Sequence, residues 1–78
     1  MTNDQDHRYQ RAMSQGHSAA WDQDWNKAAE FYKQALGQKP EDAKAMNSLA
    51  LAYFEMQEYD EALQMYLKAA KIAPDDPV

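Results

Sequence analysis

The sequence predicts an all-α protein of four antiparallel helices, and three observations lead to this fold class. The chain has two glycines and three prolines in 78 residues, too few for the many tight turns of an all-β protein. It repeats itself with one constant shift, so that aromatic, small, aromatic, small and proline positions recur in the same order. Within each repeat, the apolar residues have the spacing of helices rather than strands.

The internal repeat divides the chain into two units, residues 9–42 and 43–76. We expect residues 9–76 to form one domain behind a flexible leader, residues 1–8. The pairs related by the shift are Trp25 with Tyr59, Ala28 with Ala62, Tyr32 with Tyr66, Ala35 with Ala69 and Pro40 with Pro74. Earlier in each unit, the pairs are Ala12 with Met46, Gly16 with Ala50 and Ala19 with Tyr53. Agreement at so many positions indicates two copies of one supersecondary unit.

The first predicted helix covers residues 9–22. Ala12, Gly16 and Ala19 stand at i, i+4 and i+7, which places them on one face of that helix. Because a glycine within a helix costs about 1 kcal/mol relative to alanine, we expect Gly16 to mark a close approach of another helix.

The second predicted helix covers residues 25–37. Its inward face carries two alanines and one tyrosine at the same spacing: Ala28, Tyr32 and Ala35. A tyrosine of one helix would then fill the space that small residues of the other leave. Asp24 precedes this helix and is expected to be its N-cap, and Pro40 ends it because proline cannot continue a helix.

The third and fourth predicted helices cover residues 43–56 and 59–72. Asp42 is expected to cap the third helix, as Asp24 caps the second. The fourth helix repeats the face of the second with Ala62, Tyr66 and Ala69, and Pro74 ends it.

The sequence argues against catalysis and against a bound metal or cofactor. Without cysteine the chain has neither disulfides nor thiolate ligands. Asp22 and Asp24 begin like a calcium loop, but Lys27 and Lys33 occupy the places where such a loop needs glycine and a bidentate glutamate. The two histidines are ten residues apart with no accompanying metal motif, and no serine has a recognisable base and acid partner. We therefore expect that the protein is not an enzyme.

The charge and the termini bear on partners and location. A net charge of −5 argues against nucleic acid and favours a neutral or basic partner. The start "MTNDQDHR" lacks the pattern of a signal peptide, and no apolar run approaches the ~18 residues of a membrane helix. We expect a cytoplasmic protein without membrane contact.

These residues resemble the tetratricopeptide repeat, a helix–turn–helix unit. In the second unit, the signature places hold Leu49, Ala50, Tyr53, Tyr59, Ala62, Tyr66, Ala69 and Pro74, with Met46 where tryptophan is usual. The first unit is looser in its first helix, where Ala12, Gln15 and Ala19 replace larger residues. The resemblance implies a short right-handed α-solenoid. It also implies that Trp25 is an inter-helix anchor equivalent to Tyr59, and it gives Trp21 no structural role.

The resemblance implies a protein–protein interaction module that binds a peptide or protein segment in a concave groove along the first helix of each unit. The groove residues of the first unit would be Gln10, Met13, His17, Ala20 and Trp21. Those of the second unit would be Lys44, Asn47, Leu51, Phe54 and Glu55. Trp21 and Phe54 are the candidate anchors. For Trp21 one alternative stays open, namely that its ring packs on a neighbouring helix or on the leader.

A second hypothesis is a structural unit that assembles with itself, or a fragment of a longer repeat array, with no peptide ligand of its own. The last predicted helix has further apolar residues outside its inward face: Leu63, Leu67, Ala70 and Ile72. Exposed apolar patches mark contact sites, and symmetric self-association covers them most simply. We therefore predict a weak homodimer through the C-terminal repeat.

Overall fold

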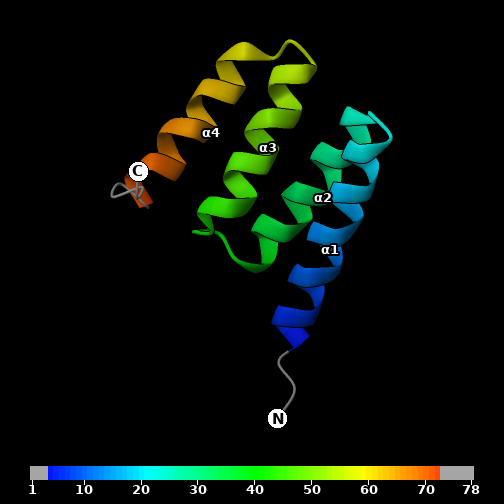
Figure 1. Cartoon of the computed structure of the whole chain (residues 1–78). Helices are drawn as coiled ribbons and strands as arrows, with labels where there is room; N and C mark the ends of the chain where they lie inside the picture. Colours follow the sequence, from blue (N-terminus) through cyan, green and yellow to red (C-terminus); the bar gives the residue numbers. More distant parts are fainter. Residues whose placement is uncertain (1–3, 73–78) are drawn as a thin grey trace.

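The computed structural model describes residues 4–72 and contains four helices (Figure 1). Their bounds are α1 Asp4–Trp21, α2 Trp25–Gln38, α3 Ala43–Glu55 and α4 Tyr59–Ile72. Each helix runs antiparallel to the one before it, and they stand side by side in chain order, so that only neighbours along the chain pack extensively. No strand occurs in the described part of the chain. The all-α prediction of four antiparallel helices is confirmed.

Aspartates begin the second and third helices, as the sequence predicts. The Asp24 carboxylate accepts a hydrogen bond from the Lys27 backbone N–H at 3.3 Å, and that of Asp42 accepts one from Ala45 at 2.9 Å. These bonds satisfy N–H groups that have no partner within their own helix. Helix α2 ends two residues before Pro40, as expected, whereas Pro74 lies outside the described residues.

The first helix begins earlier than the sequence indicates. The structure differs from the expectation of a flexible leader at residues 4–8, because these residues form the first turns of α1. Asp4 and Asp6 lie in the first turn, where negative charge is favoured by the helix dipole.

Contacts with the α2–α3 turn hold this early start of α1 in place. The Tyr9 hydroxyl donates a hydrogen bond to the Asp42 carboxylate that also caps α3. The Lys39 ammonium lies 3.0 Å from the Asp6 carboxylate and 4.5 Å from the centre of the Tyr9 ring. One aspartate therefore links the first helix to the start of the second repeat, and burial together with this bond raises the pKa of Tyr9 to about 12.

Gly16 marks the close approach of helices that the sequence predicts. It is buried, and a Cβ atom at this position would lie only 2.5 Å from Cε1 of Tyr32. The Tyr32 ring fills the space beside the glycine and is 3% exposed. Burial raises the pKa of Tyr32, and a hydrogen bond with Ser48 of α3 opposes that shift.

The two short turns within the repeats share a feature that the sequence analysis did not anticipate. Gln23 and Gln57 have positive φ values of 62° and 66°, and they occupy equivalent positions in the two repeats. Each follows the last turn of a helix and lets the chain reverse direction, a role that glycine usually fills. The same local geometry therefore recurs in both repeats.

Candidate functional site

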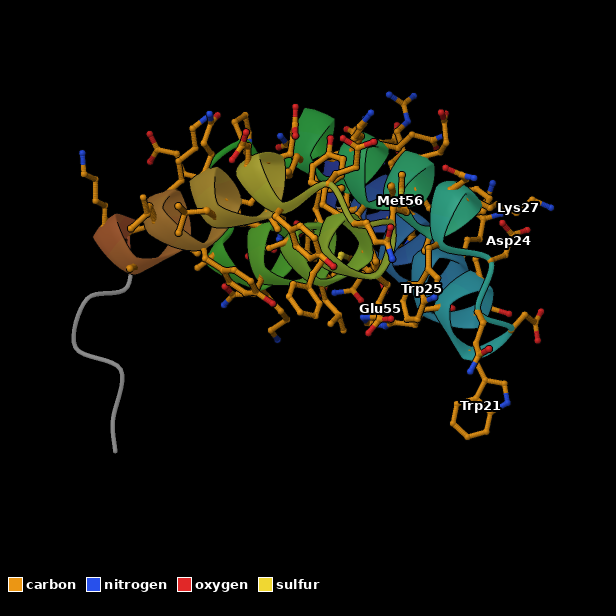
Figure 2. The ribbon with its side chains drawn as sticks, turned by 90° about the horizontal axis from the view of Figure 1, so that it is seen from above. Trp21, Asp24, Trp25, Lys27, Glu55 and Met56 are labelled. Carbon is orange, nitrogen blue, oxygen red and sulfur yellow. The ribbon has the colours of Figure 1, made fainter. Side chains whose placement is uncertain are left out.

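The groove candidates lie on the side of the stack formed by α1 and α3. Seen from above in Figure 2, α1 and α3 lie along one side of the molecule and α2 and α4 along the other. The repeat period places the candidates in equivalent pairs: Gln10 with Lys44, Met13 with Asn47, His17 with Leu51, Ala20 with Phe54 and Trp21 with Glu55. Most of these side chains are exposed, which a binding face requires.

Met13 differs from the groove expectation. It is 5% exposed and packs in the core with Tyr9 and Ala12, and Ala20 is half-buried. Met13 lies close to the inward-facing side of α1, and a long flexible side chain at this position turns toward the neighbouring helices. Met13 therefore belongs to the core and is not an exposed contact of the predicted groove.

A hollow of about 320 Å³ lies between the middle of α1 and the first turn of α3. Its lining consists of Tyr9, Gln10, Met13, Ser14, His17 and Lys44. Gln10, His17 and Lys44 were predicted for the groove, and the structure brings them together around this one depression. Tyr9 and Ser14 were missed. Tyr9 stands seven residues before Gly16, so helical periodicity already placed it on the inward face.

Trp21 stands at the other end of the same side. It is the last residue of α1 and is 88% exposed, and Figure 2 shows its ring projecting away from the body of the molecule. The alternative that Trp21 packs on a neighbouring helix is therefore wrong. Trp25 behaves in the opposite way, since it is half-buried against the core and Figure 2 shows it between the helices, as an anchor would be.

Phe54 and Leu51 extend the apolar surface along α3. Phe54 is 51% exposed, and its ring meets Tyr59 edge to face with the ring centroids 5.3 Å apart. This contact restricts the phenylalanine ring, so that less conformational entropy is lost when a partner covers it. His17 is similarly placed against the Tyr32 ring, with the centroids 5.6 Å apart.

The charged residues of this side lie at its two ends. Lys44 is in the first turn of α3 and Glu55 is its last residue, and both are exposed. The C-termini of α1 and α3 point to the same end, where helix dipoles add partial negative charge. The Trp21 end is thus aromatic and acidic, whereas the hollow at the other end carries Lys44.

The part of the chain that the structure describes contains neither a metal-binding cluster nor a membrane-spanning helix. Within residues 4–72 no group of three or more histidines, aspartates or glutamates is arranged to hold a metal ion. The same range contains no helix that combines the length and the hydrophobicity needed to cross a bilayer. The tyrosines whose pKa is raised, Tyr9 and Tyr32, serve helix packing, because each is buried and bonded to a neighbouring segment.

A stack of antiparallel helix pairs, with one helix of each pair along a common open side, defines a helical-repeat protein. The chain belongs to the tetratricopeptide repeat family, whose model matches residues 22–78. Repeats of this family generally mediate protein–protein interactions and are typically not catalytic. Helix α1 lies outside the match, in agreement with the small residues that replace larger ones there. Comparison with curated proteins gave no match, and neither did comparison with solved structures.

Proposed function

We propose that the chain is an interaction module that binds a peptide or protein segment along α1 and α3, and so acts as an adaptor or scaffold. The observation that carries this proposal is the 88% exposure of Trp21, which projects on the side of the stack where α1 and α3 lie. Phe54 of α3 is 51% exposed. Burying a tryptophan or phenylalanine ring removes roughly 150–250 Å² of surface from water. Aromatic side chains presented in this way are the residues that most often dominate binding energy.

The partner is proposed to be neutral or basic. A lysine or arginine of the partner would stack on the Trp21 ring and pair with Glu55, since these two residues occupy equivalent positions at the acidic end of the groove. The rest of the segment would pass over Phe54 and Leu51 toward the hollow beside His17. The net charge of −5 favours the same kind of partner.

Selection of binders from a random-peptide library, followed by affinity measurement on variants, tests this function. Trp21→Ala and Phe54→Ala should each weaken the selected peptides by about 2 kcal/mol, roughly thirtyfold, while leaving the fold intact. Leu63→Ala is the matched control, because Leu63 has a similar exposure, 57%, but lies on α4. Glu55→Gln should weaken the peptides that contain lysine or arginine more than the others.

Two readouts distinguish the groove from other surfaces. The variant Trp25→Phe leaves Trp21 as the single tryptophan, so its emission should shift to the blue when a peptide covers it. Amide NMR shifts upon binding should cluster on α1 and α3. Shifts confined to α4, or equal affinity of Trp21→Ala and the wild type, would mean that binding uses another surface. Unfolding of both alanine variants would show that the two aromatic residues belong to the core.

A further inference from the structure

Helix α4 carries an apolar stripe that the groove does not use. At 3.6 residues per turn, one face of this helix presents Tyr59, Leu63, Tyr66, Leu67 and Ala70, which we call the α4 stripe. All five residues are exposed. Ile72, which the sequence analysis grouped with Leu63, lies nine positions further on. Nine residues are about two and a half turns, so Ile72 points to the opposite side of the helix and is not part of the stripe.

Much of the equivalent surface on α2 is covered by α3, although Lys33, the counterpart of Leu67, is exposed. Ala29 and Tyr32 are the counterparts of Leu63 and Tyr66 in the first repeat, and each is 3% exposed because α3 packs over it. Leu63 and Tyr66 are 57% and 41% exposed. No helix among the described residues packs on α4 as α3 packs on α2. The α4 stripe therefore has the form of a surface that receives one helix lying along it.

The opposite end of the stack does not fit this surface. The positions of α3 that pack toward α2 include Ala45, Leu49 and Ala52, which are buried, and the equivalent positions of α1 are Arg11, Gln15 and Ser18, which are exposed. If copies stacked head to tail, α1 of one copy would bury Arg11 and Gln15 against the apolar stripe of the next. Burying such groups without partners is costly, so this open-ended assembly is disfavoured.

We propose that the α4 stripe binds the α4 stripe of a second copy of this chain, with the two helices antiparallel across a two-fold axis. Charge supports this occupant and this direction. Asp60 and Lys71 flank the stripe on the same side, about 60–80° around the helix from Leu63. An axis that passes between Met65 and Tyr66 sets Asp60 of each copy beside Lys71 of the other.

In a parallel pair, the flank of α4 that carries Asp60 and Lys71 would meet the opposite flank of the second copy, so these ion pairs would not form. The antiparallel pair gains both ion pairs and opposes the two helix dipoles. It also brings Leu63 of one copy against Leu67 of the other, so both leucines leave water. Helix α1 lies at the opposite end of the stack from α4, so the part of the groove that α1 carries, including Trp21, stays open in the pair.

Sedimentation velocity of the full chain tests the contact. A single helix pair makes a small interface, so the wild type should pass from monomer to dimer between about 10 μM and about 1 mM. Leu67→Glu should weaken the dimer at least about tenfold, because the carboxylate would be buried against leucine. Leu51→Glu is the matched control, since Leu51 is also an exposed leucine but lies on α3, and it should dimerise like the wild type. A wild type that stays monomeric throughout, or a Leu67→Glu variant with wild-type association, overturns the proposal.

Single cysteines test the direction of the pair, because the chain has no cysteine of its own. Across the proposed axis, the two copies of position 67 are offset by about 4–5 Å along the helices, and the two copies of position 60 by about 16 Å. Leu67→Cys should therefore form a disulfide-linked dimer under mild oxidation, and Asp60→Cys should not. Efficient crosslinking of Asp60→Cys would indicate a parallel pair and refute the antiparallel one. Failure of both variants to crosslink, at concentrations where the wild type is dimeric, would show that dimers use another face.

Discussion

The two glycines of the chain provide a matched pair of substitutions whose effects should have opposite signs. Gly16 lies in α1 and Gly37 lies in α2, so alanine should favour helix at both positions by roughly 1 kcal/mol. The surroundings differ. A Cβ at position 16 would lie 2.5 Å from Cε1 and 2.7 Å from Cδ1 of Tyr32, whereas a Cβ at position 37 meets nothing within 4 Å.

The Tyr32 ring cannot move aside cheaply. It is 3% exposed, touches the His17 ring and is hydrogen-bonded to Ser48 on the next repeat. Overpacking of this kind costs typically ~1–3 kcal/mol, which exceeds the gain in helix propensity over most of that range. We expect Gly16→Ala to lower the free energy of unfolding by up to about 2 kcal/mol, and Gly37→Ala to raise it by about 0.5–1 kcal/mol.

Urea unfolding followed by circular dichroism measures both effects, and the midpoints of thermal unfolding should differ by about 10 °C between the two variants. The variant Tyr32→Leu removes the ring, so in that background Gly16→Ala should be neutral or stabilising. If Gly16→Ala stabilises the native chain as much as Gly37→Ala does, the close packing of Gly16 on Tyr32 is refuted. The close packing is also refuted if Gly16→Ala remains destabilising in the Tyr32→Leu background.

Two further predictions concern the link between α1 and the second repeat. Asp42→Ala should destabilise the chain by more than the ~1 kcal/mol expected for loss of an exposed cap, because the Tyr9 hydroxyl loses its partner as well. Urea unfolding measures this cost, with Asp24→Ala as the control that removes only a cap. Equal costs for the two variants would contradict the prediction. Burial and the bond to Asp42 raise the pKa of Tyr9 from its ordinary value of 10 to about 12, so the stability that this group contributes is complete below pH 10 and is lost as the pH rises through 12. Urea midpoints measured across that range should fall less steeply for Tyr9→Phe than for the wild type, and parallel curves would contradict the assignment.

Local features of the sequence were sufficient to predict the four helices and, within one residue, all of their limits except the start of the first. Aspartates before a helix and proline after it act on the adjacent backbone groups, so Asp24, Asp42 and Pro40 could be interpreted without knowledge of distant residues. The repeat added the pairing of helices, because a small residue such as Gly16 needs a large partner such as Tyr32 to fill the space beside it. The resemblance to the tetratricopeptide repeat indicated the exposed face of α1 and α3, apart from Met13, which is buried, and Ala20, which is half-buried.

Tertiary contacts decided what periodicity left open. The early start of α1 is accompanied by contacts of Asp6 with Lys39 and of Tyr9 with Asp42, and both partners lie far along the chain from α1. Tyr32 and Tyr66 occupy the same place in the repeat, yet Tyr32 is buried and Tyr66 is exposed. The difference arises because α3 packs on α2, whereas no described residue covers α4 in the same way. The sequence alone determines which face of each helix is apolar, since that depends on spacing along one helix. Whether such a face becomes core or binding surface depends on which neighbour lies against it, and only the assembled stack decides that.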